Sequence, residues 1–228
     1  MRYIRHRKFA QNPGMYIRGF LLLQKDLGNL FEYIEPVDAN LECYSFRVYE
    51  LLLRACTEVE ANCKAILREN GYTRTRNLNM DDYRKAEESH RLSGFEVRLP
   101  VWRGHNEIRA PFKPWSTGEP LPWYQAYNQT KHDRSEAFKN ATFEHAIDAI
   151  CGVLAVLSAQ FTDQGFSLTQ GYMKESVEHG FERAIGKYFV VRYPVWPDDE
   201  RYEFTPGEWE EIRKAQDDPF QNFPYSLP

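Results

Sequence analysis

Residues 42–70, ECYSFRVYELLLRACTEVEANCKAILREN, have the pattern of a long amphipathic helix. Their apolar side chains recur at spacings of three and four and form one continuous stripe: Val48, Leu51, Leu52, Ala55, Cys56, Val59, Cys63, Ile66 and Leu67. The pair Asn70-Gly71 is a typical helix end. A helix of about 28 residues is roughly 42 Å long, which is enough for the spine of a helical bundle.

Three further segments show helical periodicity. Residues 19–34 are amphipathic and end before Pro36, and residues 121–132 carry Pro122 where a first helical turn tolerates it. Residues 138–161 are apolar on nearly every face, which places them in the middle of a domain or at a subunit interface. The sequence therefore predicts a mainly α protein with a core of four helices.

The remaining segments predict a small peripheral β element and long loops rich in Pro and aromatic residues. Residues 94–101 and 187–193 resemble strands that are too short to stand alone, so we expect them to pair with each other. We also expect short helices within 79–90 and 206–215, a Pro-rich loop from 111 to 122, and an extended strap over 217–228.

The expected domain organisation has three parts. Residues 1–18 form a basic N-terminal arm, residues 19–161 form the helical bundle with an inserted segment at 71–120, and residues 162–228 form an extension packed on the bundle. A chain of 228 residues is long enough to bury a core without disulfides or metal.

Charge and cysteine content narrow the function classes. A net charge of −4 argues against a protein that coats nucleic acid indiscriminately, although it leaves room for a local basic patch. None of the four cysteines forms a CxxC pair, which fits a reducing compartment. The first apolar run, Phe20–Leu23, is too short for a signal peptide or a membrane span, so the expected location is cytoplasmic, with no membrane partner.

Polar chemistry is concentrated in residues 123–134, WYQAYNQTKHDR. On a helix, Tyr124, Asn128 and His132 are spaced four residues apart, so we expect them to form one stripe with Lys131 beside it. An amide, an imidazole, an ammonium and a phenol would then converge on one small volume. This stretch is the candidate site.

General acid/base chemistry suits these residue types. His132 can exchange a proton near neutral pH. Lys131 or Arg134 could stabilise an anionic phosphorane, and Asn128 could orient the imidazole or a phosphate oxygen. Such a set is suited to metal-independent RNA cleavage, in which the ribose 2′-hydroxyl is the nucleophile.

A structural role for the same residues is equally open. Asn128 and His132 could pair with Glu50, Glu58 or Glu60 of the long helix, forming a buried polar knot. Antiparallel packing would bring the two polar stripes together, with Glu50 or Glu58 as the expected partner. The supporting network would then comprise Glu50, Arg54, Glu58, Tyr124 and Tyr127.

Other chemistries find less support in the sequence. Asp133, Glu136 and His145 have no recognised metal-ligand spacing, and no Ser or Cys lies in a nucleophile motif. No Gly-rich phosphate loop or cofactor signature occurs, so we expect neither metal nor cofactor. A small-molecule enzyme would need an aromatic pocket, for which the candidates are Trp115, Trp123 and Tyr124. Tryptophans such as Trp102, Trp115 and Trp123 are more often anchors of the core.

The chain resembles the HEPN superfamily. The residues that carry the resemblance are Asn128-Gln-Thr-Lys131-His132 at a helix end and, on the long helix, Glu50-Leu-Leu-Leu-Arg54 and Glu60-Ala-Asn-Cys-Lys64. The run from Tyr44 to Phe161 is also similar to a group of bacterial proteins with the phrases Tyr-Glu-Leu-Leu-Leu-Arg and Tyr-Asn-x-x-Lys-His-Asp-Arg. The resemblance implies a four-helix bundle that forms a homodimer.

The same resemblance leaves two functions open. Members of the superfamily include RNases of toxin, defence and RNA-processing systems, and others have lost catalysis and serve as binding partners. In the nuclease motif an Arg usually stands five residues before the His, and this chain has Tyr127 there. The substitution favours a dimeric binding or regulatory module for RNA, a nucleotide or a protein over an RNase that uses His132.

Overall fold

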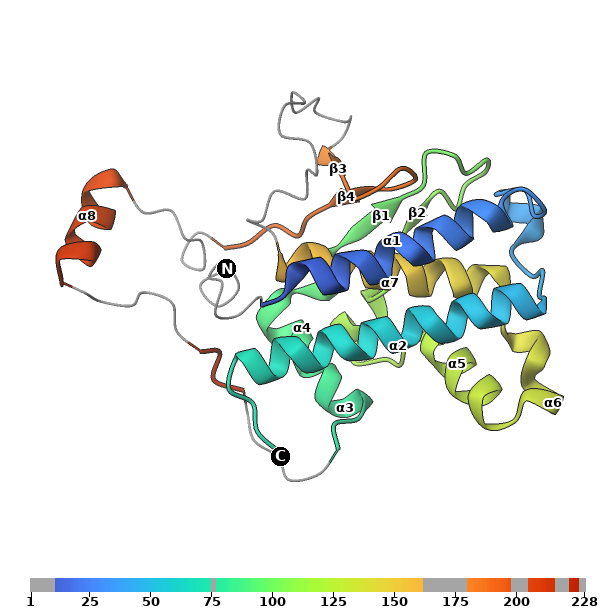
Figure 1. Ribbon diagram of the computed structural model, residues 1–228, viewed down its shortest axis with the longest axis horizontal. Helices are drawn as coiled ribbons and strands as arrows, with labels where there is room; N and C mark the ends of the chain where they lie inside the picture. Colours follow the sequence, from blue (N-terminus) through green and yellow to red (C-terminus); the bar gives the residue numbers. More distant parts are fainter. Residues whose placement is uncertain (1–10, 75–76, 162–179, 198–204, 216–221, 226–228) are drawn as a thin grey trace.

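The computed structural model describes residues 11–74, 77–161, 180–197, 205–215 and 222–225. The fold is mainly helical (Figure 1), as the sequence predicts. Its long helices are α1 (Pro13–Leu30), α2 (Phe46–Glu69), α5 (Pro122–His132) and α7 (Phe143–Gln160). Helix α7 packs against the other three, and α2 also contacts α1 and α5. The four helical segments expected from periodicity are therefore all present, and α7 and α2 hold them together.

Helix α7 is the centre of the core. It is long and apolar enough to cross a membrane by length and composition alone, but 83% of its residues are buried inside the chain. That burial is typical of the central helix of a globular core. Its apolar surface is covered by the same chain, so it gives no reason to expect a subunit interface along this helix.

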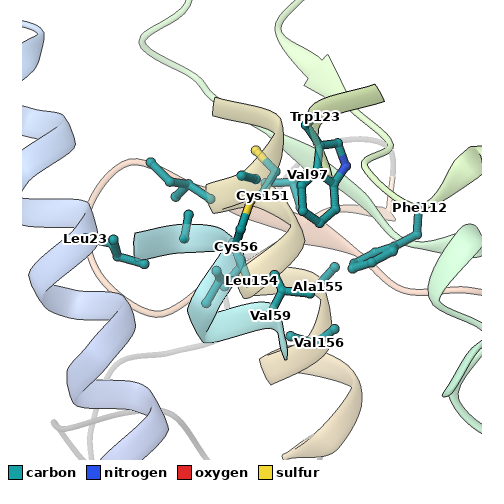
Figure 2. Packing of buried hydrophobic residues seen from close by; sticks show 14 of the residues in the cluster. Leu23, Cys56, Val59, Val97, Phe112, Trp123, Cys151, Leu154, Ala155 and Val156 are labelled. Atoms are coloured by element: carbon teal, nitrogen blue, oxygen red, sulfur yellow. The ribbon is translucent and has the colours of Figure 1, made fainter. Parts of the chain in front are cut away.

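Figure 2 shows how the core is assembled around α7. Leu23 of α1, Cys56 of α2 and Trp123 of α5 approach Cys151 and its neighbours from different elements, and all of these side chains are buried. Gly152 allows α5 to come close, because a Cβ at this position would lie 3.3 Å from Cζ2 of Trp123. Trp123 also donates a hydrogen bond from its indole nitrogen to the carbonyl of Pro111 at 2.8 Å.

Helix boundaries follow capping residues rather than the apolar pattern. Helix α1 begins at Pro13, so the arm expected over residues 1–18 is too long: Pro suits the first turn, and Asn12 precedes it in the left-handed conformation. Residues 1–10 lie outside the described part. Helix α2 begins at Phe46 rather than residue 42 because the Ser45 hydroxyl accepts a hydrogen bond from the Val48 amide at 3.3 Å.

Short helices interrupt the segment between α2 and α5. The expected helix within 79–90 is present as two pieces, α3 (Met80–Tyr83) and α4 (Lys85–His90), and it is followed by the 3₁₀ turns η3 (Leu92–Gly94) and η4 (Lys113–Thr117). The other short elements are η2 (Asp38–Asn40), α6 (Arg134–Ala137), η5 (Phe138–Asn140) and α8 (Pro206–Ala215). Helix α8 confirms the helix expected over 206–215.

The sheet confirms the expected pairing of two distant segments. Strand β1 (Glu96–Arg98) pairs antiparallel with β4 (Val190–Arg192), with Val97 opposite Val191. Two very short strands, β2 (Ile108–Arg109) and β3 (Glu182–Arg183), extend the sheet in the order β2-β1-β4-β3. The sequence analysis did not anticipate β2 or β3, because two residues are too few for a recognisable alternation.

The described end of the chain packs on the bundle, as the expected strap would. The ring of Tyr225 lies 5.8 Å from that of Tyr72, and its hydroxyl is 2.5 Å from Ser89 Oγ on α4. The Phe223 amide donates to Asn70 Oδ1 at 3.4 Å. Residues 222–225 therefore cover the C-terminal end of α2, whereas most of the expected strap and residues 162–179 of the expected extension lie outside the described residues.

Candidate functional site

Helix α5 divides its polar side chains between two faces. At 3.6 residues per turn, a spacing of four residues drifts by about 40°, so Tyr124 and His132 are separated by roughly 80° around the helix. Tyr124 lies on the buried face together with Tyr127, whereas His132 is exposed. The single stripe expected from spacing is therefore split, and Asn128, half-buried, lies between the two faces.

The inner face of α5 makes a hydrogen bond to α2 and another within its own helix. Tyr124 donates from its phenol to Glu60 Oε1 at 2.9 Å, and Lys131 Nζ donates to the Tyr127 phenol at 3.0 Å. Burial, reinforced by Glu60, raises the pKa of Tyr124 well above its usual range. The bond to Tyr127 raises the pKa of Lys131, so this ammonium is held charged beside the phenol.

The favoured acidic partners for α5, Glu50 and Glu58, are wrong, and the third candidate, Glu60, is the one that reaches this helix. Glu50 is exposed and pairs with Arg47 at 3.0 Å, and Arg54 pairs with Asp26 of α1. Glu58 lies against Gly19 of α1, where burial raises its pKa. The ladder of Glu50, Arg54 and Glu58 therefore faces α1 and solvent. Glu60 lies two residues beyond Glu58, about 200° around the helix, and so reaches α5 instead.

The four proposed catalytic residues do not converge on one pocket. Lys131, His132 and Arg134 are exposed, and Lys131 is engaged by Tyr127. Neither Asn128 nor His132 makes a side-chain hydrogen bond within the described part of the chain. Arg134 instead lies 5.8 Å from the centre of the Phe46 ring. His132 is thus neither a member of a buried knot nor oriented by an acidic neighbour.

A hollow of about 620 Å³ lies on the outer side of α5, and we call it the amide hollow. Its polar lining includes Gln125, Gln129, Lys139, Asn140 and His145. Nδ1 of His145 is 2.8 Å from the carbonyl oxygen of Asn140, an atom that only accepts, so Nδ1 carries the hydrogen. In the neutral imidazole Nε2 is then an acceptor or base.

An exposed aromatic cluster lies beside the amide hollow. Tyr44, which lines the hollow, is 53% exposed and Phe46 is 60% exposed. Both rings pack on Phe138, with centres 5.7 Å and 4.8 Å away. Phe138 therefore supports two large rings that remain open to solvent, and Arg134 adds a positive charge next to one of them.

A second cavity, of about 610 Å³, is lined by Arg109 and Asp148. The Arg109 side chain is buried, with Nη1 2.9 Å from Glu144 Oε1 and 3.4 Å from Asp148 Oδ1. The guanidinium also lies 5.4 Å from the centre of the Trp102 ring. Burial raises the pKa of Asp148 to about 7, with Arg109 opposing the shift and Glu144 adding to it.

The proposed aromatic pocket is not assembled as expected. Trp115, Trp123 and Tyr124 are all buried, which agrees with a role as core anchors. Of the three, Trp123 lines the cavity beside Arg109, while Trp115 packs on Phe112 with ring centres 4.8 Å apart. Trp102 is likewise buried, and its indole donates to Asp38 Oδ1 at 2.8 Å.

The nearby metal-ligand candidates have structural partners. Asp133 Oδ1 accepts from the Glu136 amide at 3.3 Å and so begins α6, and His145 is bonded to Asn140. Across the described residues, no group of three or more His, Cys, Asp or Glu side chains is placed to hold a metal ion.

Sequence reasoning missed Arg109, Glu144 and Asp148 as site residues and considered His145 only as a metal ligand. Glu144, His145 and Asp148 lie on the first turns of α7, and Arg109 comes from a two-residue strand. The spacing of four between Glu144 and Asp148 does not by itself mark a site, because their common partner Arg109 lies 35 residues before Glu144 in the sequence.

Comparisons with known proteins assign no family to the chain. It matches no protein-family model, no curated protein and no solved structure. Its function therefore has to be inferred from the chemistry of its own residues.

Proposed function

We propose that this protein is a helical module that binds single-stranded RNA without cleaving it. The observation that carries the proposal is the pair of solvent-exposed rings, Tyr44 and Phe46, at the edge of the amide hollow. Exposed aromatic rings bind unstacked bases of any sequence through their faces, at roughly 1–3 kcal/mol for each base.

The surroundings of these rings support RNA as the partner. Arg134 lies beside Phe46 and Lys139 lines the hollow, so positive charges are available for the phosphates. The amides of Gln125 and Gln129 in the hollow offer donors and acceptors of the kind that read base edges. Glu42 also lines the hollow, and with a net charge of −4 the affinity should be modest and fall with salt.

Binding without cleavage is favoured by the state of the HEPN-like motif. A nuclease of this kind needs a cation that clamps the phosphate next to the acid/base imidazole. Tyr127 occupies the position of the motif's Arg, is buried, and engages Lys131. Within the proposal, the chain is a HEPN-like bundle of the silent, binding type.

The direct test measures binding of a fluorescently labelled, short single-stranded RNA by anisotropy. Tyr44→Ala and Phe46→Ala should each weaken binding by about tenfold, because each removes one stacking ring. Tyr33→Ala is the matched control, since Tyr33 is 85% exposed and lies outside the hollow's lining. Wild-type protein that fails to bind the RNA, or an equal loss in the control, contradicts the proposal.

Metal-independent RNA cleavage is the second candidate. One observation favours it: His132 is exposed at the end of α5. The same helix supplies Gln125 and Gln129 to the amide hollow, which His145 also lines. Incubation of wild-type protein with the same RNA in EDTA should leave the RNA intact. Cleavage that is lost in both His132→Ala and His145→Ala would replace the binding proposal with the nuclease.

The homodimer and the cytoplasmic location stay predictions. The apolar faces of α7 are buried within the chain, so the dimer now rests on the family resemblance alone. Light scattering at micromolar concentration should give about twice the chain mass of 26.9 kDa, and a species of the chain mass alone would count against the dimer.

A further inference from the structure

One nitrogen of the Arg109 guanidinium forms ion pairs, and the other two have no hydrogen-bond partner among the described residues. Nη1 reaches Glu144 and Asp148, whereas Nε and Nη2 are buried and find no hydrogen-bond partner among the described residues. The N–H groups of Nε and Nη2 point the same way from the planar group. They therefore form the pair of parallel donors that binds both oxygens of a carboxylate.

An unpaired edge in this position is unusual. Arg109 is only 6% exposed, and buried donors in folded proteins nearly always have an acceptor. A charged group left half-satisfied in a low dielectric destabilises the fold. The missing acceptor for Nε and Nη2 is expected to come from a bound molecule.

The adjoining cavity is suited to a small organic molecule. Its volume of about 610 Å³ is in the range of ligand sites. Arg109 and Asp148 line it, and much of the remaining wall is apolar, with contributions from Pro111, Pro114 and Trp123. A polar anchor beside an apolar wall selects a ligand that has a charged head and a flat, apolar body.

We propose that this cavity binds a small aromatic or aliphatic carboxylate, whose two oxygens accept hydrogen bonds from Nε and Nη2 of Arg109 and whose body packs against Trp123. A monoanion is favoured over a phosphate dianion, because Glu144 and Asp148 already bring acidic groups to the guanidinium. Both nitrogens are shielded from solvent in this structure, so the proposal requires the carboxylate to displace the groups that cover them. The proposal does not depend on RNA binding, because the Tyr44 and Phe46 side chains do not line this cavity.

Binding of the carboxylate should take up a proton at Asp148. A second negative charge close to Arg109 favours the neutral form of Asp148, so affinity should fall as the pH rises through the range in which Asp148 titrates. The charged and titratable groups facing Asp148 are Arg109 of β2 and Glu144 and Cys151 of α7, and the cavity wall adds Lys113 and Glu119.

Calorimetry on the full chain with benzoate as the probe tests the assignment. Benzoate should bind at about pH 6 and several-fold more weakly at about pH 8, and Asp148→Asn should remove this difference. Benzamide, which has the same shape without the charge, should bind at least about tenfold more weakly. Phenyl phosphate that binds more tightly than benzoate would overturn the carboxylate assignment in favour of a phosphate site.

Arg109→Lys keeps the charge but lacks the paired donors, so it should weaken benzoate binding by at least about tenfold. A measurement on the wild-type protein guards against a variant that does not fold. In an NMR spectrum of the indole N–H groups of the five tryptophans, benzoate should change the chemical shift of Trp123 and leave that of Trp196 unchanged. No binding up to the solubility limit of benzoate, or binding without a shift of Trp123, refutes the site.

Discussion

The phenol of Tyr124 on α5 donates a hydrogen bond to Glu60 Oε1 on α2, with the two oxygens 2.9 Å apart. Tyr124 is 7% exposed, so this bond lies at the edge of the core rather than in solvent. The sequence predicted a bond from Asn128 or His132 to an acidic residue of the long helix, and the structure has the bond from Tyr124 to Glu60 instead. The bond therefore links the orientation of α5 to α2.

Tyr124→Phe should destabilise the protein by about 1 kcal/mol, because the substitution removes one hydrogen bond to a charged acceptor that remains partly accessible to water. The measurement is urea denaturation followed by circular dichroism. Tyr33→Phe, at an exposed position, is the control and should change stability by less than about 0.5 kcal/mol. A double-mutant cycle with Glu60→Gln should show coupling of the two side chains, and strict additivity would show that the bond contributes nothing.

His132→Ala should leave the melting temperature nearly unchanged. His132 is exposed and makes no side-chain hydrogen bond within the described residues, and surface substitutions of this kind usually stay within about 0.5 kcal/mol. This outcome differs from the loss of a few kcal/mol that a buried polar knot at His132 would produce. A clear drop in melting temperature would show that the imidazole has a stabilising partner outside the described residues.

Local pattern was sufficient for the helices and for one strand pair. The stripe from Val48 to Leu67 identifies α2 because burial of one helix face imposes its own period on the sequence. The pairing of β1 with β4 could be predicted because each strand is apolar and too short to be stable alone. Helix starts were less accurate, since Ser45 and Pro13 define them by capping and first-turn geometry.

The site was harder to predict from the sequence than the helices were, for a geometric reason. A spacing of four residues suggests one stripe, but its drift of about 40° per step turns His132 away from Tyr124. Arg109 and Asp148 are brought together by the sheet packing on α7, and no local spacing encodes that contact. Chemistry that depends on long-range contacts is visible only once the elements are placed.

The four cysteines should differ sharply in reactivity. Cys56, Cys63 and Cys151 are buried, and burial raises the pKa of Cys63 to about 12 and those of Cys56 and Cys151 well above the usual range. Cys43 is partly exposed, so it should react first. Titration of the native protein with a disulfide reagent should show one fast thiol that disappears in Cys43→Ser, and the other three should react only after guanidinium is added. Rapid reaction of several thiols in the native state would contradict the packing around α7.

Asp148 should make the folded state less stable as the pH rises from about 4 to about 7. Its pKa is raised from 3.8 to about 7 by burial, so within this range the folded protein binds a proton that the unfolded chain has released. Above about pH 7 the carboxylate is ionised in both states, and the stability has been lost in full. A shift of about three units corresponds to at most about 4 kcal/mol, and we expect about half of that because the side chain is 22% exposed.

Asp148→Asn keeps the shape of the side chain and removes its titration. Relative to wild type, the variant should therefore gain roughly 2 kcal/mol between about pH 4 and about pH 8, measured as the difference between their free energies of unfolding in urea. Asp81→Asn changes an exposed carboxylate and serves as the control, for which the difference from wild type should vary much less with pH. If Asp148→Asn and wild type follow parallel pH profiles, Asp148 is ionised throughout, and Arg109 rather than burial dominates its environment.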